Sequence, residues 1–407
     1  MTDGPATASA HPDTTTRPEA QARPDTDPTG RLGFRGGVIE VSRAVLHVLP
    51  AWVVARVVVT VALAVARGGV GTLRPGNPAA FQRVHEGLLS WDAGWYQAIA
   101  LHGYAAAGQQ SVRFFPLYPL LGRALGQVPG TGVAAALVVV ANLSALVAMA
   151  GLWLLVRHDS GDLGLARRSV WLLALAPPAY SLVLAYSDAT LLLCSVVTFL
   201  GARTGRWWWA AAAGLAAGLD RPVGVLLVLP LALEVWNRRH DATPGSATAR
   251  VAALAGPVVG AGAYLAWVGH RFGDTWLPFT VQQQNGHRGQ FAVPVTAMWR
   301  DLVDAAHGHH LGSALHVPWV LACLALVVVC WKRLPGSYTA FAVVVLAVAL
   351  SSTNLDSFER YALGAFPFVV AASIHTASRR VEVVVLVTSG LAMAGYAVLS
   401  FLGVVVP

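Results

Sequence analysis

Two tryptophans flank a carboxylate in the stretch Trp91-Asp92-Ala93-Gly94-Trp95-Tyr96. Residues 79–101 are predicted to form one helix, whose apolar face would carry Phe81, Val84, Leu88 and Leu89. Such a helix lies along a membrane surface. Asp92 would be held there between Trp91 and Trp95 and partly desolvated, which makes it a candidate functional residue. The alternative is an interfacial helix on which Asp92 only caps the helix or faces water.

Further ionisable residues stand where apolar segments begin or end. Asp188 opens one segment, Asp220-Arg221 joins two short ones, and Glu359-Arg360 opens another. Placing such a group in a membrane costs about 2–3.5 kcal/mol, so it usually faces a cavity or a partner. Local pairs of Asp220 with Arg221 and of Glu359 with Arg360 are the alternative. Adjacent residues on a helix point in different directions, so this pairing is the weaker explanation.

A polar loop, Gln282-Gln283-Gln284-Asn285-Gly286-His287-Arg288, precedes a histidine-rich stretch that holds His307, His309 and His310. Histidine tracts can bind metals, and Asp301 and Asp304 are close by. An exposed polar loop is the favoured interpretation, because no ligands stand at helical metal-binding spacing. Walker, dinucleotide-binding and HExxH zinc motifs are absent from the sequence. We therefore expect no cofactor, and a metal requirement stays open.

The elements that position these residues are apolar. The 407-residue chain is 56% hydrophobic and 12% charged, whereas soluble domains are about 25% charged. This composition predicts an all-α, polytopic integral membrane protein with about eleven membrane-spanning helices, within a range of nine to twelve. We expect the spans near residues 45–66, 133–156, 169–185, 188–202, 207–219, 222–236, 251–268, 316–331, 337–350, 361–377 and 381–405.

Basic residues predict the orientation. Arginines cluster in alternate loops, as at residues 157–168, 203–206, 238–250 and 379–380, and such loops face the cytoplasm. Residues 1–36 are predicted to be a disordered cytoplasmic tail, and residues 37–407 to be the membrane domain. The long loops 67–132 and 269–315 would then face outward from the cell membrane. Because the arginines are scattered between apolar runs, nucleic acid is not an expected partner.

Several motifs together resemble the PIG-V-like mannosyltransferases, the bacterial relatives of GPI mannosyltransferase 2. The first outer loop matches through Trp91–Tyr96, through Ile99-Ala100-Leu101-His102-Gly103-Tyr104 and through Phe114-Phe115-Pro116-Leu117-Tyr118-Pro119. Later matches are Tyr186-Ser187-Asp188, Arg221-Pro222-Val223-Gly224, residues 273–288, and Arg360-Tyr361 with Phe366-Pro367. At the position of Asp188 the family tends to have Glu. Asp220 and His287 depart from the family pattern, which tends to have Thr and Gly there. The resemblance covers about residues 45–375.

The resemblance implies a GT-C glycosyltransferase fold and transfer of mannose from a polyprenyl-phosphate donor on the outer face. Asp92 matches the family's first-loop aspartate and would be the general base, with inversion at the anomeric carbon. Cations must hold the leaving phosphate. The candidates, in order, are Arg221, Arg360, Arg288 and Arg113, of which Arg113 departs from the small apolar residue that is common in the family. Trp95, Tyr96 and Tyr118 could stack on sugar, and His102 and Asp188 complete the substrate-binding set.

Two alternatives remain open. A GT-C enzyme could transfer another sugar, such as glucose or arabinofuranose, to its lipid-linked or envelope acceptor. A non-catalytic carrier of polyprenyl-phosphate lipids would need the cations and the lipid groove but not the carboxylate of Asp92.

Overall fold

Helices make up most of the described chain in the computed structural model. It describes residues 34–240, 245–284, 288–296, 298–299, 303, 307 and 316–407. The only strand-like pairing in this part is an antiparallel bridge between Phe291 and Ser352. The chain divides into residues 1–42 and residues 43–407. Residues 1–33 of the predicted tail lie outside the described part.

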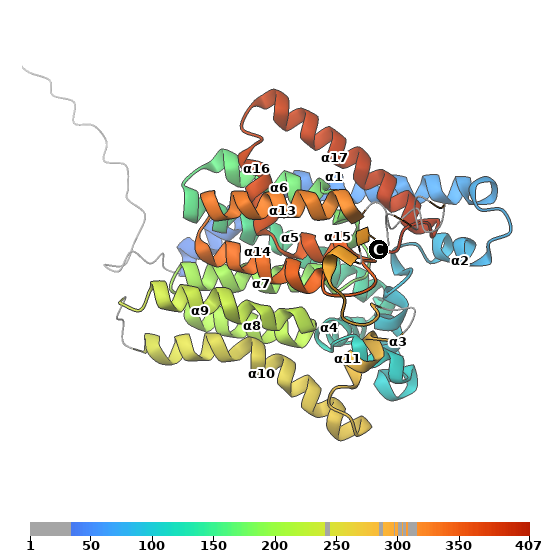
Figure 1. The fold of residues 1–407 in the computed structure, drawn as a ribbon, viewed down its shortest axis with the longest axis horizontal. Coiled ribbons are helices and arrows are strands. Elements are labelled where there is room, and N and C mark those ends of the chain that lie inside the picture. The colour runs from blue at the N-terminus through green and yellow to red at the C-terminus, as the bar shows by residue number, and fades with distance from the viewer. Residues whose placement is uncertain are drawn as a thin grey trace, which may run out of the picture. The chain divides into compact units, whose positions relative to one another are not determined.

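The α-helices carry the labels of Figure 1. They are α1 (Phe34–Leu73), α2 (Pro78–Glu86), α3 (Ala93–Ala107), α4 (Leu117–Gly126), α5 (Gly132–Ser160), α6 (Leu163–Leu175), α7 (Asp188–Arg203), α8 (Trp207–Asp220), α9 (Val228–Asn237), α10 (Ser246–Phe272), α11 (Leu277–Gln282), α13 (His316–Arg333), α14 (Gly336–Ala349), α15 (Phe358–Gly364), α16 (Pro367–Ile374) and α17 (Arg379–Phe401). Short 3₁₀ segments span Gly87–Leu89, Gln109–Arg113, Pro177–Leu182 and Pro222–Leu227.

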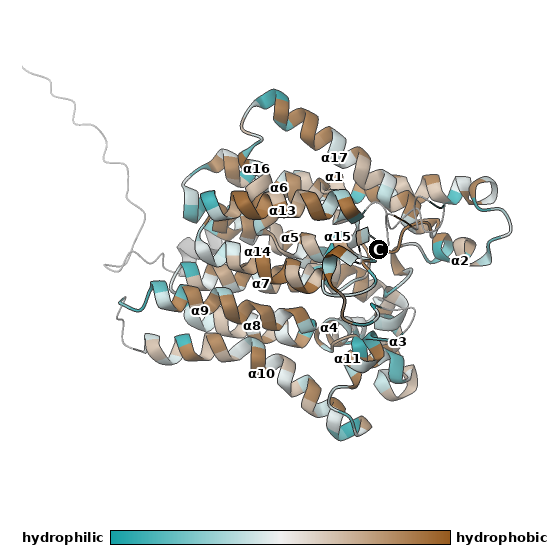
Figure 2. Ribbon diagram, in the orientation of Figure 1, coloured by the Kyte–Doolittle hydropathy of each residue, from teal (hydrophilic) through white to brown (hydrophobic). Residues whose placement is uncertain are grey.

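Among the described residues, five helices are long and apolar enough to cross a membrane: Glu40–Leu73 within α1, and α5, α10, α13 and α17. Figure 2 shows hydrophobic residues along these helices and polar residues at helix ends. Other predicted spans are shorter or broken. In the predicted span 169–185 the helix ends at Leu175, before Pro177 and Pro178, which interrupt the apolar run in the sequence. The predicted span 361–377 is broken between α15 and α16. Proline favours such breaks because it lacks an N–H donor.

Glycines allow α8 and α10 to pack backbone against backbone. A Cβ atom at Gly218 would lie 2.2 Å from the carbonyl oxygen of Pro257, and one at Gly260 would lie 2.1 Å from that of Leu215. No larger side chain fits at these distances unless the helices separate. Small residues at such crossings are typical of helix packing in membranes.

One end of residues 43–407 gathers the ends of four helices in a polar network. Arg203 on α7 donates to Asp159 on α5 at 2.9 Å, and its Nη1 lies 3.4 Å from Glu234 on α9. At the start of α14, Ser337 donates to Glu234 and Tyr338 to Asp159, each at 2.5 Å. The loops next to these residues are among those predicted to share one side of the membrane, and the structure places them together.

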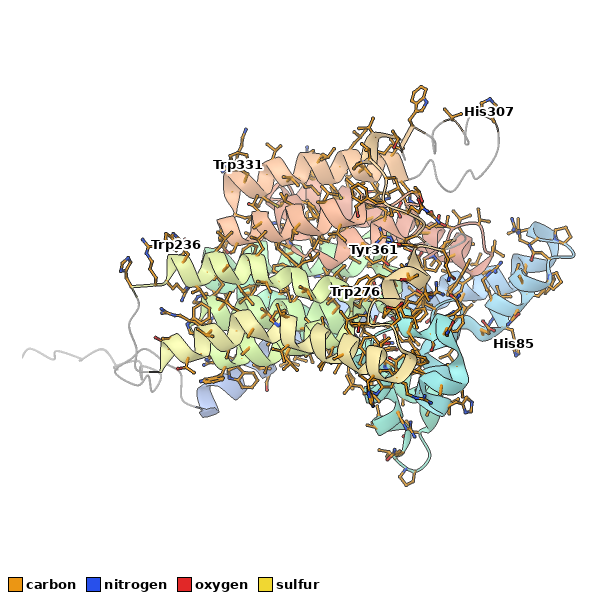
Figure 3. All side chains as sticks on the ribbon, turned by 60° about the horizontal axis from the view of Figure 1, so that its bottom comes forward. His85, Trp236, Trp276, His307, Trp331 and Tyr361 are labelled. Atoms are coloured by element: carbon orange, nitrogen blue, oxygen red, sulfur yellow. The ribbon has the colours of Figure 1, made fainter. Side chains whose placement is uncertain are left out.

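The residues predicted to carry chemistry lie away from this network. Figure 3 shows Trp236 and Trp331 at one end of the helices and Tyr361 toward the other. Trp236 and Trp331 are 65% and 79% exposed, as suits rings at a membrane interface. The membrane side that each end faces stays a prediction.

Candidate functional site

The predicted continuous helix over residues 79–101 is wrong. Helix α2 ends at Glu86, and α3 starts only at Ala93. Two positive φ angles make the break, +59° at Gly87 and +59° at Trp91. A left-handed backbone is uncommon for a bulky side chain, and contacts with distant segments hold Trp91 there. Its indole donates to the carbonyl of Ser400 on α17 at 3.1 Å, and the Arg83 guanidinium lies 4.6 Å from its ring.

This break places Asp92 at the N-cap position of α3 rather than within a helix face. The Asp92 side chain makes no capping hydrogen bond. Instead, its Oδ2 accepts a hydrogen bond from Nη2 of Arg360 at 3.1 Å. About 34% of the Asp92 side chain is exposed, against 6% of the Arg360 side chain. Arg360 therefore holds the carboxylate on its buried side, and the exposed side of the carboxylate can contact a ligand.

Arg360, on the short helix α15, joins two carboxylates from different parts of the chain. Besides Asp92, it faces Asp188, with 3.6 Å between Arg360 Nε and Asp188 Oδ1. Its guanidinium also lies 5.0 Å from the ring centre of Tyr186, within the range of a cation–π contact. The loop of residues 67–132, the start of α7 and α15 thus meet at one guanidinium.

Arg221 reaches the same aspartate from the turn between α8 and α9. Its Nη1 donates to Oδ1 of Asp188 at 2.6 Å. The turn folds tightly onto α8, because a Cβ atom at Gly224 would lie only 2.1 Å from the carbonyl oxygen of Ala217. Glycine at this position is what lets the turn bring Arg221 to the first residue of α7.

Neither local pair considered from the sequence is the contact that forms. Asp220 is fully buried and accepts a hydrogen bond from Thr190 Oγ1 at 2.9 Å. Glu359 is bonded to His316 at 2.7 Å. The arginines beside them instead pair with carboxylates far away in the sequence.

Arg288 comes from the second long loop, which pairs with residues 351–354. The N–H groups of Thr353 and Asn354 donate to the carbonyls of Gln290 and Arg288 at 3.0 and 3.1 Å. The Arg288 side chain donates to the carbonyl of Ala349 at 2.8 Å and to Ser352 Oγ at 3.1 Å. These bonds hold a third guanidinium beside α15.

Tyr361 lies among the three arginines. The contact of its ring with their guanidiniums was not predicted from the sequence. Its ring centre is 4.5, 5.2 and 5.8 Å from the guanidinium carbons of Arg288, Arg221 and Arg360. Its place in the Arg360-Tyr361 motif was the available signal. These side chains and Asp188 line a pocket of about 20 Å³, enough for about one water molecule.

The pocket carries an excess of positive charge. Three guanidiniums, those of Arg221, Arg288 and Arg360, line it together with one carboxylate, Asp188. Asp92 adds a second carboxylate through its bond to Arg360, which still leaves one cation more than anions. A phosphodiester anion is a suitable partner for such a set, because guanidiniums bind its oxygens through charge-assisted, often bidentate hydrogen bonds.

Arg113 lies beside the aromatic residues of the loop 67–132. Its guanidinium is 5.5 Å from the ring of Trp95 and 4.8 Å from that of Phe114. Burial lowers the pKa of Arg113 from its ordinary value, and the charge of Asp92 acts in the opposite sense. An arginine remains charged in proteins, so Arg113 is a fourth cation near Asp92.

The aromatic residues of the loop mainly build its packing. Tyr96 is buried and its hydroxyl bonds with Ser187 Oγ at 2.6 Å, while Tyr118, also buried, donates to the carbonyl of Leu137 at 2.8 Å. Their rings pack edge to face, 4.9 Å apart. In this structure neither ring offers a face to a sugar. Trp95 is partly exposed and His102 is exposed, so Trp95 is the better placed of the expected stacking residues.

The histidine-rich stretch is only partly described. His307 is exposed. The other polar residues singled out there, His287, His309, His310, Asp301 and Asp304, lie outside the described residues.

No family model matches the chain, and no curated protein matches it. The resemblance to PIG-V-like mannosyltransferases therefore depends on the order of the motifs alone.

Proposed function

We propose that this protein is a membrane glycosyltransferase that moves a sugar from a polyprenyl-phosphate donor to a lipid-linked or envelope acceptor. The resemblance indicates mannose as the sugar. The proposal includes a GT-C-like fold of about eleven spans in the cell membrane, with the catalytic loops on the extracytoplasmic face. The five long apolar helices and the shorter ones beside them support a polytopic membrane domain.

One observation carries the proposal. Arg360 links Asp92 and Asp188, and Arg221 and Arg288 complete a cationic pocket from two further segments. A carboxylate at the edge of an anion site is the arrangement that glycosyl transfer from a phosphodiester needs. A general base must lie within about 2.6–3.2 Å of the acceptor hydroxyl, and cations must stabilise the leaving phosphate.

The reaction would proceed in one displacement. The acceptor oxygen attacks the anomeric carbon while Asp92 takes the hydroxyl proton. The bond from the anomeric carbon to the phosphate oxygen breaks, and its electron pair leaves on polyprenyl phosphate. Because no enzyme nucleophile intervenes, the anomeric configuration inverts.

Two of the three arginines, Arg221 and Arg360, form ion pairs whose carboxylate partner the donor can replace. Asp188 holds Arg221 and Asp92 holds Arg360. When the phosphodiester approaches, its oxygens replace the carboxylates as acceptors of these hydrogen bonds, because guanidiniums bind phosphate oxygens through charge-assisted, often bidentate hydrogen bonds. Asp92 is then free to face the acceptor hydroxyl. Binding also requires the small pocket to widen, since about 20 Å³ cannot hold a sugar phosphate.

The test uses the full-length protein reconstituted with polyprenyl-phosphate donors that carry labelled mannose, glucose or arabinofuranose, together with membrane extract as the source of acceptor. We expect one donor to lose its sugar to an acceptor in the wild type, with release of polyprenyl phosphate. Donor binding without turnover of any of the three would contradict the enzyme proposal and favour the lipid carrier. Profiling the lipids and glycans of a deletion strain then identifies the acceptor, as the species that lacks one sugar.

A further inference from the structure

A second pocket lies on the opposite side of α15 from the arginines. Its volume is about 420 Å³, and side chains from α6, α13, α15, α16 and α17 line it. This volume lies in the range of small-molecule sites, about 300–1,000 Å³. The walls are mostly apolar, and representative residues are Leu172, Cys323, Leu326, Leu363, Val369 and Val385. Helices of a membrane domain surround it, so a hydrocarbon chain is the natural occupant.

Helix α15 connects this apolar groove with the candidate catalytic site. Glu359, Ala362 and Leu363 line the groove, whereas the neighbouring Arg360, Tyr361 and Gly364 line the cationic pocket. The two sets follow the three- and four-residue spacing that puts side chains on one helix face. Arg360 is bonded to Asp92 and directly follows Glu359, so adjacent residues of α15 face the groove and hold the proposed base.

The charged groups near Glu359 favour a lipid with an uncharged head group over one with a phosphate. Glu359 is bonded to His316 at 2.7 Å, and Asp356 lies 3.8 Å from the other ring nitrogen of His316. Nearby, Trp319 donates to the hydroxyl of Tyr396 at 3.0 Å. Of these groups Glu359 lines the groove, and its carboxylate repels a phosphate but accepts hydrogen bonds from hydroxyl groups.

We infer that this groove binds the hydrocarbon chain of the acceptor, and that the acceptor is a lipid with an uncharged, hydroxylated head group. The inference rests on the proposed transferase function. The polyprenyl-phosphate donor is the other candidate occupant, but its phosphate belongs on the arginine face of α15. In this arrangement donor and acceptor bind on the two faces of one short helix.

Photo-crosslinking tests the inference without an assumption about the sugar. The probes are a diacylglycerol and a phosphatidic acid that share one diazirine-bearing acyl chain, added to the full-length protein in nanodiscs. We expect the diacylglycerol to label peptides of α13, α16 and α17 and to outcompete the phosphatidic acid. Ala322→Phe, at the groove lining, should lower this labelling about tenfold, because the ring fills the space of the chain.

Ala325→Phe is the matched control. It places the same substitution one turn further along α13 at an exposed residue outside the groove lining, and should leave labelling unchanged. Glu359→Gln should raise labelling by phosphatidic acid relative to diacylglycerol. Equal labelling of wild type and Ala322→Phe would overturn the groove assignment. Preference for phosphatidic acid in the wild type would overturn the uncharged head group.

Labelling requires neither donor nor base, so the inference and the proposed function can fail separately. Asp92→Asn should keep the diacylglycerol labelling and lose sugar transfer. If Asp92→Asn transfers sugar at the wild-type rate while labelling stays specific, the lipid site stands and the proposed catalytic role of Asp92 falls. If transfer depends on Asp92 but the groove is not labelled, the acceptor binds elsewhere.

Discussion

Replacement of Arg360 by alanine should weaken donor binding strongly. Arg360 is 6% exposed and holds Asp92 at 3.1 Å, with Asp188 at 3.6 Å. A hydrogen bond to a charged group contributes about 1.5–3 kcal/mol. At about 1.4 kcal/mol for each factor of ten, the donor Kd should rise by about 10- to 150-fold. Arg360→Lys should restore only part of the affinity, because an ammonium group cannot form the planar two-bond contact.

The assay measures donor Kd and thermal stability on the same preparations in detergent. Stability must be measured because removing one partner of a buried ion pair costs about 3–5 kcal/mol. Arg203→Lys is the control, since Arg203 also bonds two carboxylates but lies in the network of Asp159 and Glu234. It should change stability and leave donor Kd unchanged. A folded Arg360→Ala protein with donor Kd within about threefold of wild type would remove Arg360 from the phosphate site.

Three further predictions test the orientation, the packing and the third cation. In a background without the three native cysteines, His102→Cys should react with a membrane-impermeant thiol reagent from outside intact cells, and Trp331→Cys only after permeabilisation; the opposite pattern would reverse the orientation. Gly218→Ala should lower the melting temperature, because the new Cβ would lie 2.2 Å from the Pro257 carbonyl oxygen, and an unchanged melting temperature in a thermal scan would contradict the close packing of α8 and α10. Arg288→Ala should raise donor Kd less than Arg360→Ala does, since Arg288 bonds a backbone carbonyl and Ser352 but neither site carboxylate; equal or larger losses in the same binding assay would make Arg288 the main phosphate ligand.

The apolar segments and the residues that meet between them could largely be predicted from the sequence. Asp92 stands in a loop predicted to face outward, and the alternation of the predicted spans puts Asp188, Arg221 and Arg360 on the same side, where loops of a helical domain can meet. Their exact partners could not be predicted. Adjacency in the sequence suggested pairs within Asp220-Arg221 and Glu359-Arg360, whereas each arginine bonds a distant carboxylate whose position depends on helix packing.

Two other features depend on tertiary contacts and leave little trace in the sequence. The break before α3 requires a positive φ at Trp91, which its contacts with Ser400 and Arg83 stabilise. Local propensity favours no such conformation for tryptophan. The burial of Tyr118 likewise follows from packing against Tyr96 and from the bond to Leu137. An aromatic residue in a polar loop looks the same in sequence whether it contacts a sugar or supports a neighbour.

The most direct test of the proposed function is single-turnover sugar transfer by Asp92→Asn. Asparagine keeps the shape of the side chain and can still face Arg360, but it cannot take up the proton of the acceptor hydroxyl. Loss of a general base should slow transfer by about 10²- to 10⁴-fold, while donor Kd, measured in parallel, stays close to that of wild type because the arginines hold the phosphate. Transfer by the Asn variant within about threefold of the wild-type rate would contradict the assignment of Asp92 as the base.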